Sequence, residues 1–142
     1  MQSDIVSWLA TRIIEIEKLT SLLPSVAILV NDEDAVGPLA EALKTALSGA
    51  NFNVVPCHEG QFAGQENDIR VFDVQLIKGL EFEAVFFIGV DELAHRRPEL
   101  FDKYLYVGAT RAATYLGMTC DGPALPGKIT ALAQLFKADW QI

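Results

Sequence analysis

A short charged segment, Lys78-Gly79-Leu80-Glu81, separates two apolar stretches of the sequence. Val71 to Leu76 before it and Ala84 to Val90 after it have the composition of strands buried on both faces, which is typical of parallel sheets covered by helices. Ligands of open α/β folds bind at the carboxyl edge of the sheet, and we expect the chain to leave that edge at this segment. A lysine, a glycine and a glutamate in one tight connection suit a site for a charged ligand.

Basic residues concentrate in the same part of the chain. Residues 70–111 hold six Lys and Arg against seven Asp and Glu, whereas the whole chain has a net charge of −8. The overall charge argues against a stand-alone nucleic-acid binder, because neutralising phosphates takes clustered Lys and Arg. Any site for a polyanion is therefore expected within residues 70–111.

Other chemistries lack their usual sequence patterns. Cys57 and Cys120 are not at metal-ligand spacing, and His58 and His95 have no companions for a metal site or a catalytic triad. The sequence contains no G-x-S-x-G nucleophile segment and no phosphate-cradling G-x-x-x-x-G-K-[ST] loop. We therefore predict no metal site in this chain.

Length and composition indicate one domain over residues 1–142, with 51% apolar residues to build a core. The apolar runs are far shorter than the roughly 20 residues that span a bilayer, and the N-terminus lacks the basic start of a secretion signal. We expect a cytoplasmic protein that is not associated with a membrane.

Apolar periodicity and turn residues predict an α/β protein, with a mainly parallel sheet of about five strands between helices. The chain is expected to leave the second of the two strands described above at Asp91-Glu92-Leu93. The further expected strands are Val26–Val30, Asn53–Pro56 and Tyr115–Cys120. The expected helices are Ser3–Leu22, Ala35–Ser48, Glu99–Ala113 and Ile129–Phe136. The segment from Asn31 to Asp34 is expected to form a turn and a helix cap.

Three segments together resemble the second RecA-like domain of superfamily 1 helicases of the UvrD/Rep/RecB kind. Ile77-Lys-Gly-Leu-Glu-Phe82 resembles motif V of that family, and Tyr104-Leu-Tyr-Val-Gly-Ala-Thr-Arg-Ala112 resembles motif VI. Val26–Val30, followed by a helix that carries Leu39-Ala-Glu-Ala-Leu43, is similar to motif IV. The resemblance covers roughly residues 25–120, and its motifs occur in the expected order.

The resemblance implies a three-layer α/β/α, P-loop NTPase-like domain that serves as the C-terminal motor domain of a longer ATP-dependent DNA helicase of DNA repair. A preceding RecA-like domain would supply the phosphate-cradling loop and the Mg²⁺ ligands, so this domain alone is expected to hydrolyse no ATP. The span between Ala50 and Arg70 leaves no room for the 2B domain that UvrD and Rep insert there.

The resemblance also implies a nucleotide site. Arg111 corresponds to the family's arginine finger and is the expected catalytic residue, with small neighbours, including Thr110, that let a facing domain approach. Glu81 is similar to a glutamate that binds the nucleotide ribose, and Lys78 and Gly79 complete the expected nucleotide contacts. Each has a plainer interpretation, since Arg111 could pair with a nearby acid and Glu81 could be a solvated turn residue.

The expected partners include single-stranded DNA, with Gln75, Arg96 and Arg97 as its candidate contacts. Gln75 stands where the family commonly has a histidine, and Asn31 stands where it usually has a second phosphate-binding arginine. These departures favour an alternative hypothesis, a degenerate RecA-like module that binds proteins and has no ATPase activity. An unrelated doubly wound nucleotide-binding or receiver-like domain is a third interpretation, argued from architecture alone.

Overall fold

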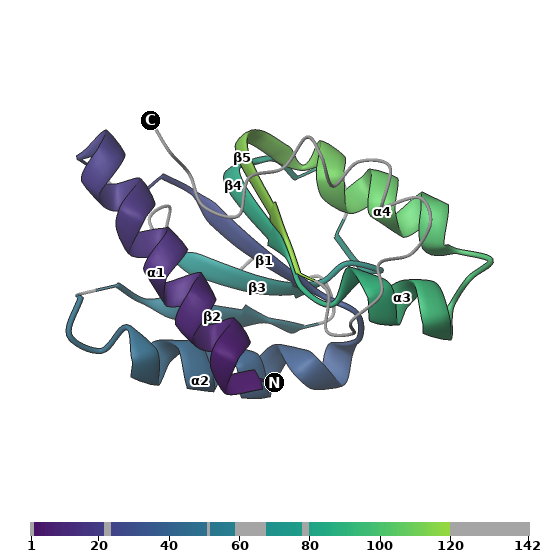
Figure 1. The fold of residues 1–142 in the computed structure, drawn as a ribbon, viewed down its shortest axis with the longest axis horizontal. Coiled ribbons are helices and arrows are strands. Elements are labelled where there is room, and N and C mark those ends of the chain that lie inside the picture. The colour runs from purple at the N-terminus through teal and green to yellow at the C-terminus, as the bar shows by residue number, and fades with distance from the viewer. Residues whose placement is uncertain (1, 22–23, 51, 59–67, 78–79, 120–142) are drawn as a thin grey trace.

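The computed structural model describes residues 2–21, 24–50, 52–58, 68–77 and 80–119. These residues form a five-stranded sheet in the order β2-β3-β1-β4-β5, and every neighbouring pair of strands is parallel (Figure 1). The strands are β1 Val26–Val30, β2 Val54–Cys57, β3 Ile69–Asp73, β4 Phe82–Phe87 and β5 Ala112–Met118. The predicted α/β class and the parallel sheet of about five strands are confirmed.

The central strand β1 is buried along its whole length. Its first residue, Val26, pairs with Ile69 of β3 on one side and with Ala84 of β4 on the other. A strand in this position has no face toward water, which explains why its sequence is apolar at every residue instead of at every second one.

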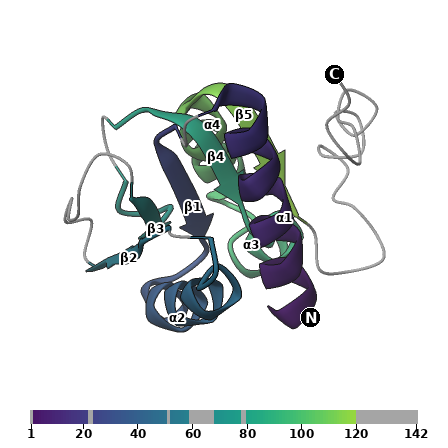
Figure 2. The same cartoon turned by 90° about the vertical axis from the view of Figure 1, so that its left-hand side faces the viewer.

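Helices cover both faces of the sheet (Figure 2). The helices α1 Gln2–Thr20 and α2 Val36–Ala46 pack in one core with alternate strand residues such as Ile28. The helices α3 Val90–Arg96 and α4 Phe101–Thr110 pack in a second core, on the opposite face, with residues such as Leu29. The expected three-layer α/β/α architecture is therefore confirmed.

Four of the five strands differ in their bounds from the prediction. The strands expected over Asn53–Pro56 and Tyr115–Cys120 run over Val54–Cys57 and Ala112–Met118. The strand expected over Val71–Leu76 runs from Ile69 to Asp73, and Val74 to Leu76 form a turn in which the Leu76 amide donates to the Asp73 carbonyl oxygen at 3.0 Å. The strand expected over Ala84–Val90 runs from Phe82 to Phe87.

The residues expected to leave the sheet, Asp91-Glu92-Leu93, do so as part of helix α3, which was not predicted. The backbone of Gly89 has a φ of 67°, in the left-handed region that glycine adopts without strain, and this bend starts the helix at Val90. The apolar run that continues through Val90 therefore belongs partly to a strand and partly to a helix.

The helix boundaries are close to the expected ones. The first helix runs from Gln2 to Thr20 instead of from Ser3 to Leu22, and a short 3-10 turn, η1 Glu33–Ala35, precedes α2. The helix expected over Glu99–Ala113 ends at Thr110, because β5 already begins at Ala112. The helix predicted over Ile129–Phe136 lies outside the described residues. No helix in the described ranges is long and apolar enough to cross a membrane.

Candidate functional site

The predicted site residues divide between the two edges of the sheet. Because all five strands are parallel, their first residues meet at the amino edge and their last residues meet at the carboxyl edge. Glu81, Thr110 and Arg111 directly precede β4 or β5 and lie at the amino edge, whereas Gln75 follows β3 at the carboxyl edge. Lys78 and Gly79 lie outside the described residues.

This arrangement corrects one expectation. Leu80 and Glu81 were expected where the chain leaves the carboxyl edge, but Glu81 is next to Phe82, the first residue of β4. A connection between parallel strands must return the chain to the amino edge before the next strand begins. The described end of the Lys78–Glu81 segment therefore lies at the amino edge, opposite to the predicted one.

A backbone hydrogen bond joins the two motifs at the amino edge. The Phe82 amide donates to the Arg111 carbonyl oxygen at 2.8 Å, and Phe82 pairs with Ala112 in the register of β4 and β5. Glu81 and Arg111 are thus neighbours at the starts of two adjacent strands, although they are 30 positions apart in the sequence. The side chain of Glu81 is exposed and that of Arg111 is half-buried.

The guanidinium of Arg111 is hydrogen-bonded to the backbone of helix α4. Its Nε donates to the Val107 carbonyl oxygen at 3.3 Å. Within the described part of the chain, no ion pair joins Arg111 to Asp102 or Glu99, the acids that a plain surface arginine was expected to use. Among the described residues, this bond from Nε is the side-chain hydrogen bond of the Arg111 guanidinium.

The hydroxyl of Thr110 is engaged with helix α4. Its Oγ1 lies 2.8 Å from the Tyr106 carbonyl oxygen and 3.2 Å from that of Val107, so the hydroxyl proton is shared within the last turn. The side chain is exposed and its oxygen can still accept a hydrogen bond.

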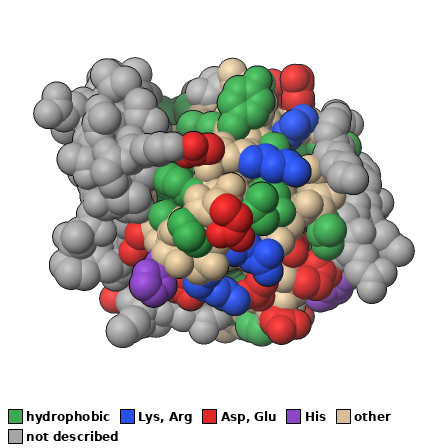
Figure 3. Space-filling view, turned by 90° about the vertical axis from the view of Figure 1, so that its right-hand side faces the viewer, with side chains coloured by type: hydrophobic (Ala, Val, Ile, Leu, Met, Phe, Trp, Pro, Cys, Tyr) green, Lys and Arg blue, Asp and Glu red, His purple; other side chains and the backbone are tan. Residues whose placement is uncertain are grey.

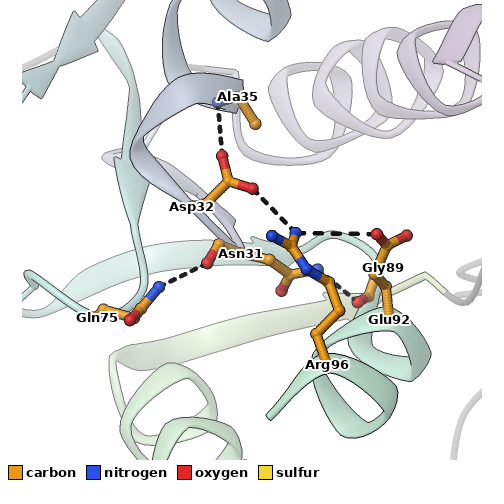
Figure 4. A network of polar contacts seen from close by, with 7 residues as sticks. All are labelled: Asn31, Asp32, Ala35, Gln75, Gly89, Glu92 and Arg96. Carbon is orange, nitrogen blue, oxygen red and sulfur yellow. Dashed lines mark hydrogen bonds and ion pairs between the residues drawn. The ribbon is translucent and has the colours of Figure 1, made fainter.

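At the carboxyl edge, side-chain amides connect the ends of neighbouring strands (Figure 4). Gln75 Nε2 donates to the Asn31 carbonyl oxygen at 2.7 Å, and Asn31 Nδ2 donates to the Gly89 carbonyl oxygen at 2.8 Å. The Gly89 amide in turn donates to Thr119 Oγ1 at 2.9 Å. This row of bonds, from Gln75 through Asn31 and Gly89 to Thr119, crosses the edge from β3 to β5, and we call it the amide row.

Asn31 stands where the family usually has a second phosphate-binding arginine, so its position relative to Arg111 is informative. Asn31 directly follows β1 at the carboxyl edge, whereas Arg111 directly precedes β5 at the amino edge. The two residues therefore do not form one phosphate site within this domain. The Asn31 side chain instead ties the end of β1 to the start of α3.

The two candidate DNA-binding arginines lie at the end of α3, and each is close to at least one acid. Arg96 Nη1 is 3.0 Å from Asp32 Oδ2 and 3.8 Å from Glu92 Oε1. The hydrogen bond to Asp32 raises the pKa of the Arg96 guanidinium. Arg97 is exposed and close enough to the buried Asp73 to affect it electrostatically. Sequence reasoning did not find the Asp32 contact, because Arg96 is 64 residues further along the chain.

Asp73 is the buried acid of this edge. Burial raises the pKa of its carboxyl above the ordinary value of 3.8; the hydrogen bond from the Gln75 amide, 2.9 Å long, opposes this effect. Glu33 and Asp32 raise the pKa further, and Arg97 lowers it.

The charges on the side of the molecule that carries α3 and α4 are mixed. Figure 3 shows Lys and Arg side chains interleaved with Asp and Glu there, with apolar side chains between them, instead of one continuous basic patch. The described residues contain no group of three or more His, Cys, Asp or Glu side chains that could hold a metal ion.

A known protein family matches the part of the chain that contains the segments resembling motifs V and VI. Residues 68–119 match the family model described as UvrD-like helicase C-terminal domain. That segment includes Gln75, Glu81, Arg96, Arg97 and Arg111 and is therefore similar to a helicase C-terminal domain, whereas the residues that resemble motif IV lie outside it.

The fold also has a similar solved structure. The C-terminal domain of a possible DNA helicase from Lactobacillus plantarum WCFS1 is similar with a TM-score of 0.60, over 85% of this chain and 67% of that chain. The two sequences are 21% identical, so the likeness concerns the fold. No curated protein sequence matches the chain significantly.

Proposed function

We propose that this chain is the C-terminal motor domain of an ATP-dependent DNA helicase, with ATP bound between it and a preceding RecA-like domain. The observation that supports this most is the hydrogen bond between the Phe82 amide and the Arg111 carbonyl oxygen. It brings Glu81 beside Arg111, and these are the two residues for which the resemblance implies contacts to one nucleotide. The family match over residues 68–119 supports the same function.

Arg111 is the proposed arginine finger. Hydrolysis of ATP builds charge on the γ-phosphate, and a guanidinium from a facing domain that stabilises this charge is worth about 10³–10⁵ in rate. The bond from Nε to the Val107 carbonyl oxygen orients the guanidinium, and its terminal nitrogens would donate to phosphate oxygens. Arginine suits this role better than lysine because its planar fork donates two parallel hydrogen bonds.

Glu81 is the proposed ribose contact, since an exposed carboxylate accepts hydrogen bonds from the two ribose hydroxyls. Lys78, Gly79 and Thr110 are the further proposed nucleotide contacts. The sequence has no phosphate-cradling loop, so the preceding domain would hold the phosphates and the Mg²⁺ ion that balances their charge.

Gln75, Arg96 and Arg97 are the proposed contacts to single-stranded DNA, at the carboxyl edge. The six residues of β4 separate this edge from Glu81, which is a distance of about 20 Å at ~3.3 Å a residue. A rigid, doubly covered sheet would therefore connect the nucleotide to the DNA surface. Closing and opening of the interdomain cleft would move the DNA surface together with Arg111.

The alternative is a degenerate RecA-like module that binds proteins. The ion pairs of Arg96 with Asp32 and Glu92 favour it, because they neutralise a cation that DNA phosphates would otherwise use.

ATP hydrolysis by the longer parent protein, with and without single-stranded DNA, separates the two functions. The helicase proposal predicts hydrolysis that single-stranded DNA stimulates, together with unwinding of a tailed duplex. A folded parent protein without ATPase activity would instead favour the interaction module.

A further inference from the structure

Asp32 holds Arg96 through a carboxylate whose two oxygens both have partners (Figure 4). Oδ1 accepts a hydrogen bond from the Ala35 amide at 3.1 Å, which caps η1. Oδ2 accepts one from Arg96 Nη1 at 3.0 Å. The cap fixes the carboxylate at the end of β1, and the fixed carboxylate in turn orients the guanidinium of Arg96.

The acids beside Arg96 neutralise the charge that would attract DNA. Asp32 and Glu92 both face the same nitrogen, Nη1, at 3.0 and 3.8 Å. A carboxylate and a phosphate offer a guanidinium similar acceptor oxygens. A DNA phosphate can therefore pair with Arg96 only by displacing a carboxylate or by sharing the cation with it.

We propose that Asp32 acts as an internal phosphate mimic that weakens binding of single-stranded DNA at the carboxyl edge. This inference rests on the proposed function, since it assigns Arg96 to the DNA surface. Asp32 occupies Arg96 in the absence of DNA, so the surface engages DNA weakly and releases it readily. A motor that steps along a strand needs such release from one of its two domains in every cycle.

Asp32→Asn tests the inference without removing the helix cap, because asparagine is as good an N-cap residue as aspartate. Glu41→Gln is the matched control: Glu41 also pairs with a cation, Lys44 at 3.9 Å, but it lies on α2 in the opposite layer. The double variant Asp32→Asn with Arg96→Gln shows whether any gain passes through Arg96. Binding of a fluorescent oligothymidylate by the 142-residue chain is measured by anisotropy at several salt concentrations.

We expect Asp32→Asn to bind the oligothymidylate about five- to tenfold more tightly than the wild-type chain and the Glu41→Gln control. The slope of log affinity against log salt should steepen by about 0.7, as expected for one additional phosphate contact on a single strand. The gain should disappear in the double variant. Circular dichroism and thermal melting confirm that each variant is folded.

Three results would overturn the inference. Equal affinity of Asp32→Asn and Glu41→Gln, or a gain that survives removal of Arg96, would overturn it while leaving the DNA surface itself intact. Absence of binding by every variant, including Asp32→Asn at the lowest salt, would overturn both the inference and the DNA surface of the proposed function.

Discussion

The Phe82 amide donates a hydrogen bond of 2.8 Å to the Arg111 carbonyl oxygen, where β4 and β5 begin. This single bond fixes the end of the K-G-L-E-F segment against the end of the Y-V-G-A-T-R-A helix. Glu81 and Arg111 therefore share the amino edge, while Gln75 and the arginines near it share the carboxyl edge. The sheet separates two groups of candidate residues that the sequence presents as one region.

Glu81→Gln should weaken nucleotide binding by the parent protein. Loss of a charge-assisted hydrogen bond costs about 1.5–3 kcal/mol, so the KM for ATP should rise on the order of tenfold or more, while kcat changes less. Glu83→Gln, the same exchange at an exposed position of β4 two residues further along, is the control and should leave KM unchanged. Equal effects of both exchanges would contradict the ribose contact.

Gly108→Ala should destabilise the domain. A Cβ at this position would lie 2.4 Å from the Phe87 ring and 3.3 Å from Leu29, both in the core under α4. Overpacking costs about 1–3 kcal/mol, which exceeds the gain of about 1 kcal/mol from replacing a helical glycine. Urea unfolding measures the change. Gly49→Ala is the control: its Cβ would meet no atom within 4 Å, and its free energy of unfolding should stay within about 0.5 kcal/mol of the wild-type value. An equally small change for Gly108→Ala would contradict the close packing of Gly108 against Phe87.

Asn31→Ala should loosen the carboxyl edge. It removes the bond to the Gly89 carbonyl oxygen, which is part-buried, but leaves the backbone oxygen that Gln75 uses. The expected loss is about 1–2 kcal/mol in the free energy of unfolding. Thr45→Ala removes an exposed hydroxyl bond within its own helix and should cost less. Hydrogen exchange should accelerate at Val90, whose amide bonds to Thr119 next to the same row, and unchanged exchange there would speak against the amide row as a connection.

Asp73→Asn should stabilise the domain at neutral pH. Burial raises the pKa of Asp73 above 3.8, so the folded chain holds this proton more tightly than the unfolded chain. The free energy of unfolding of the wild type therefore falls as the pH rises from about 3.8 through the folded pKa. Asparagine can still accept the hydrogen bond from the Gln75 amide but carries no charge. The difference in free energy of unfolding between the variant and the wild type should shrink near pH 3.8. A difference that grows toward acidic pH would contradict the raised pKa of Asp73.

Among the described strands, the central strand β1 is the one whose bounds were predicted correctly. Val26–Val30 was predicted with its observed bounds, because a central strand buried on both faces accepts only apolar residues. The start of β3 was missed because it contains Arg70, which is only 2% exposed, and a charged residue in the sequence indicates a surface. The end of β4 was missed because apolarity continues through Val90, and only the left-handed backbone of Gly89 separates strand from helix.

The candidate site was predicted by residue type but not by place. Motif spacing identified Glu81 and Arg111, yet which edge they share follows from the strand order and from the return of the chain between β3 and β4. Composition could not reveal that Asp32 pairs with Arg96, because that contact depends on where β1 and α3 end. Local patterns thus predicted the elements, whereas contacts between distant residues needed the fold.

The most direct test of the central claim is ATP hydrolysis, stimulated by single-stranded DNA, in the parent protein with Arg111→Ala. Lys103→Ala, an exposed cation on the same helix, is the control and should keep the wild-type rate. If Arg111 is the finger, kcat falls about a hundredfold or more while nucleotide binding is largely retained. Hydrolysis by Arg111→Ala at the wild-type rate would show that Arg111 does not act on ATP and would contradict the account.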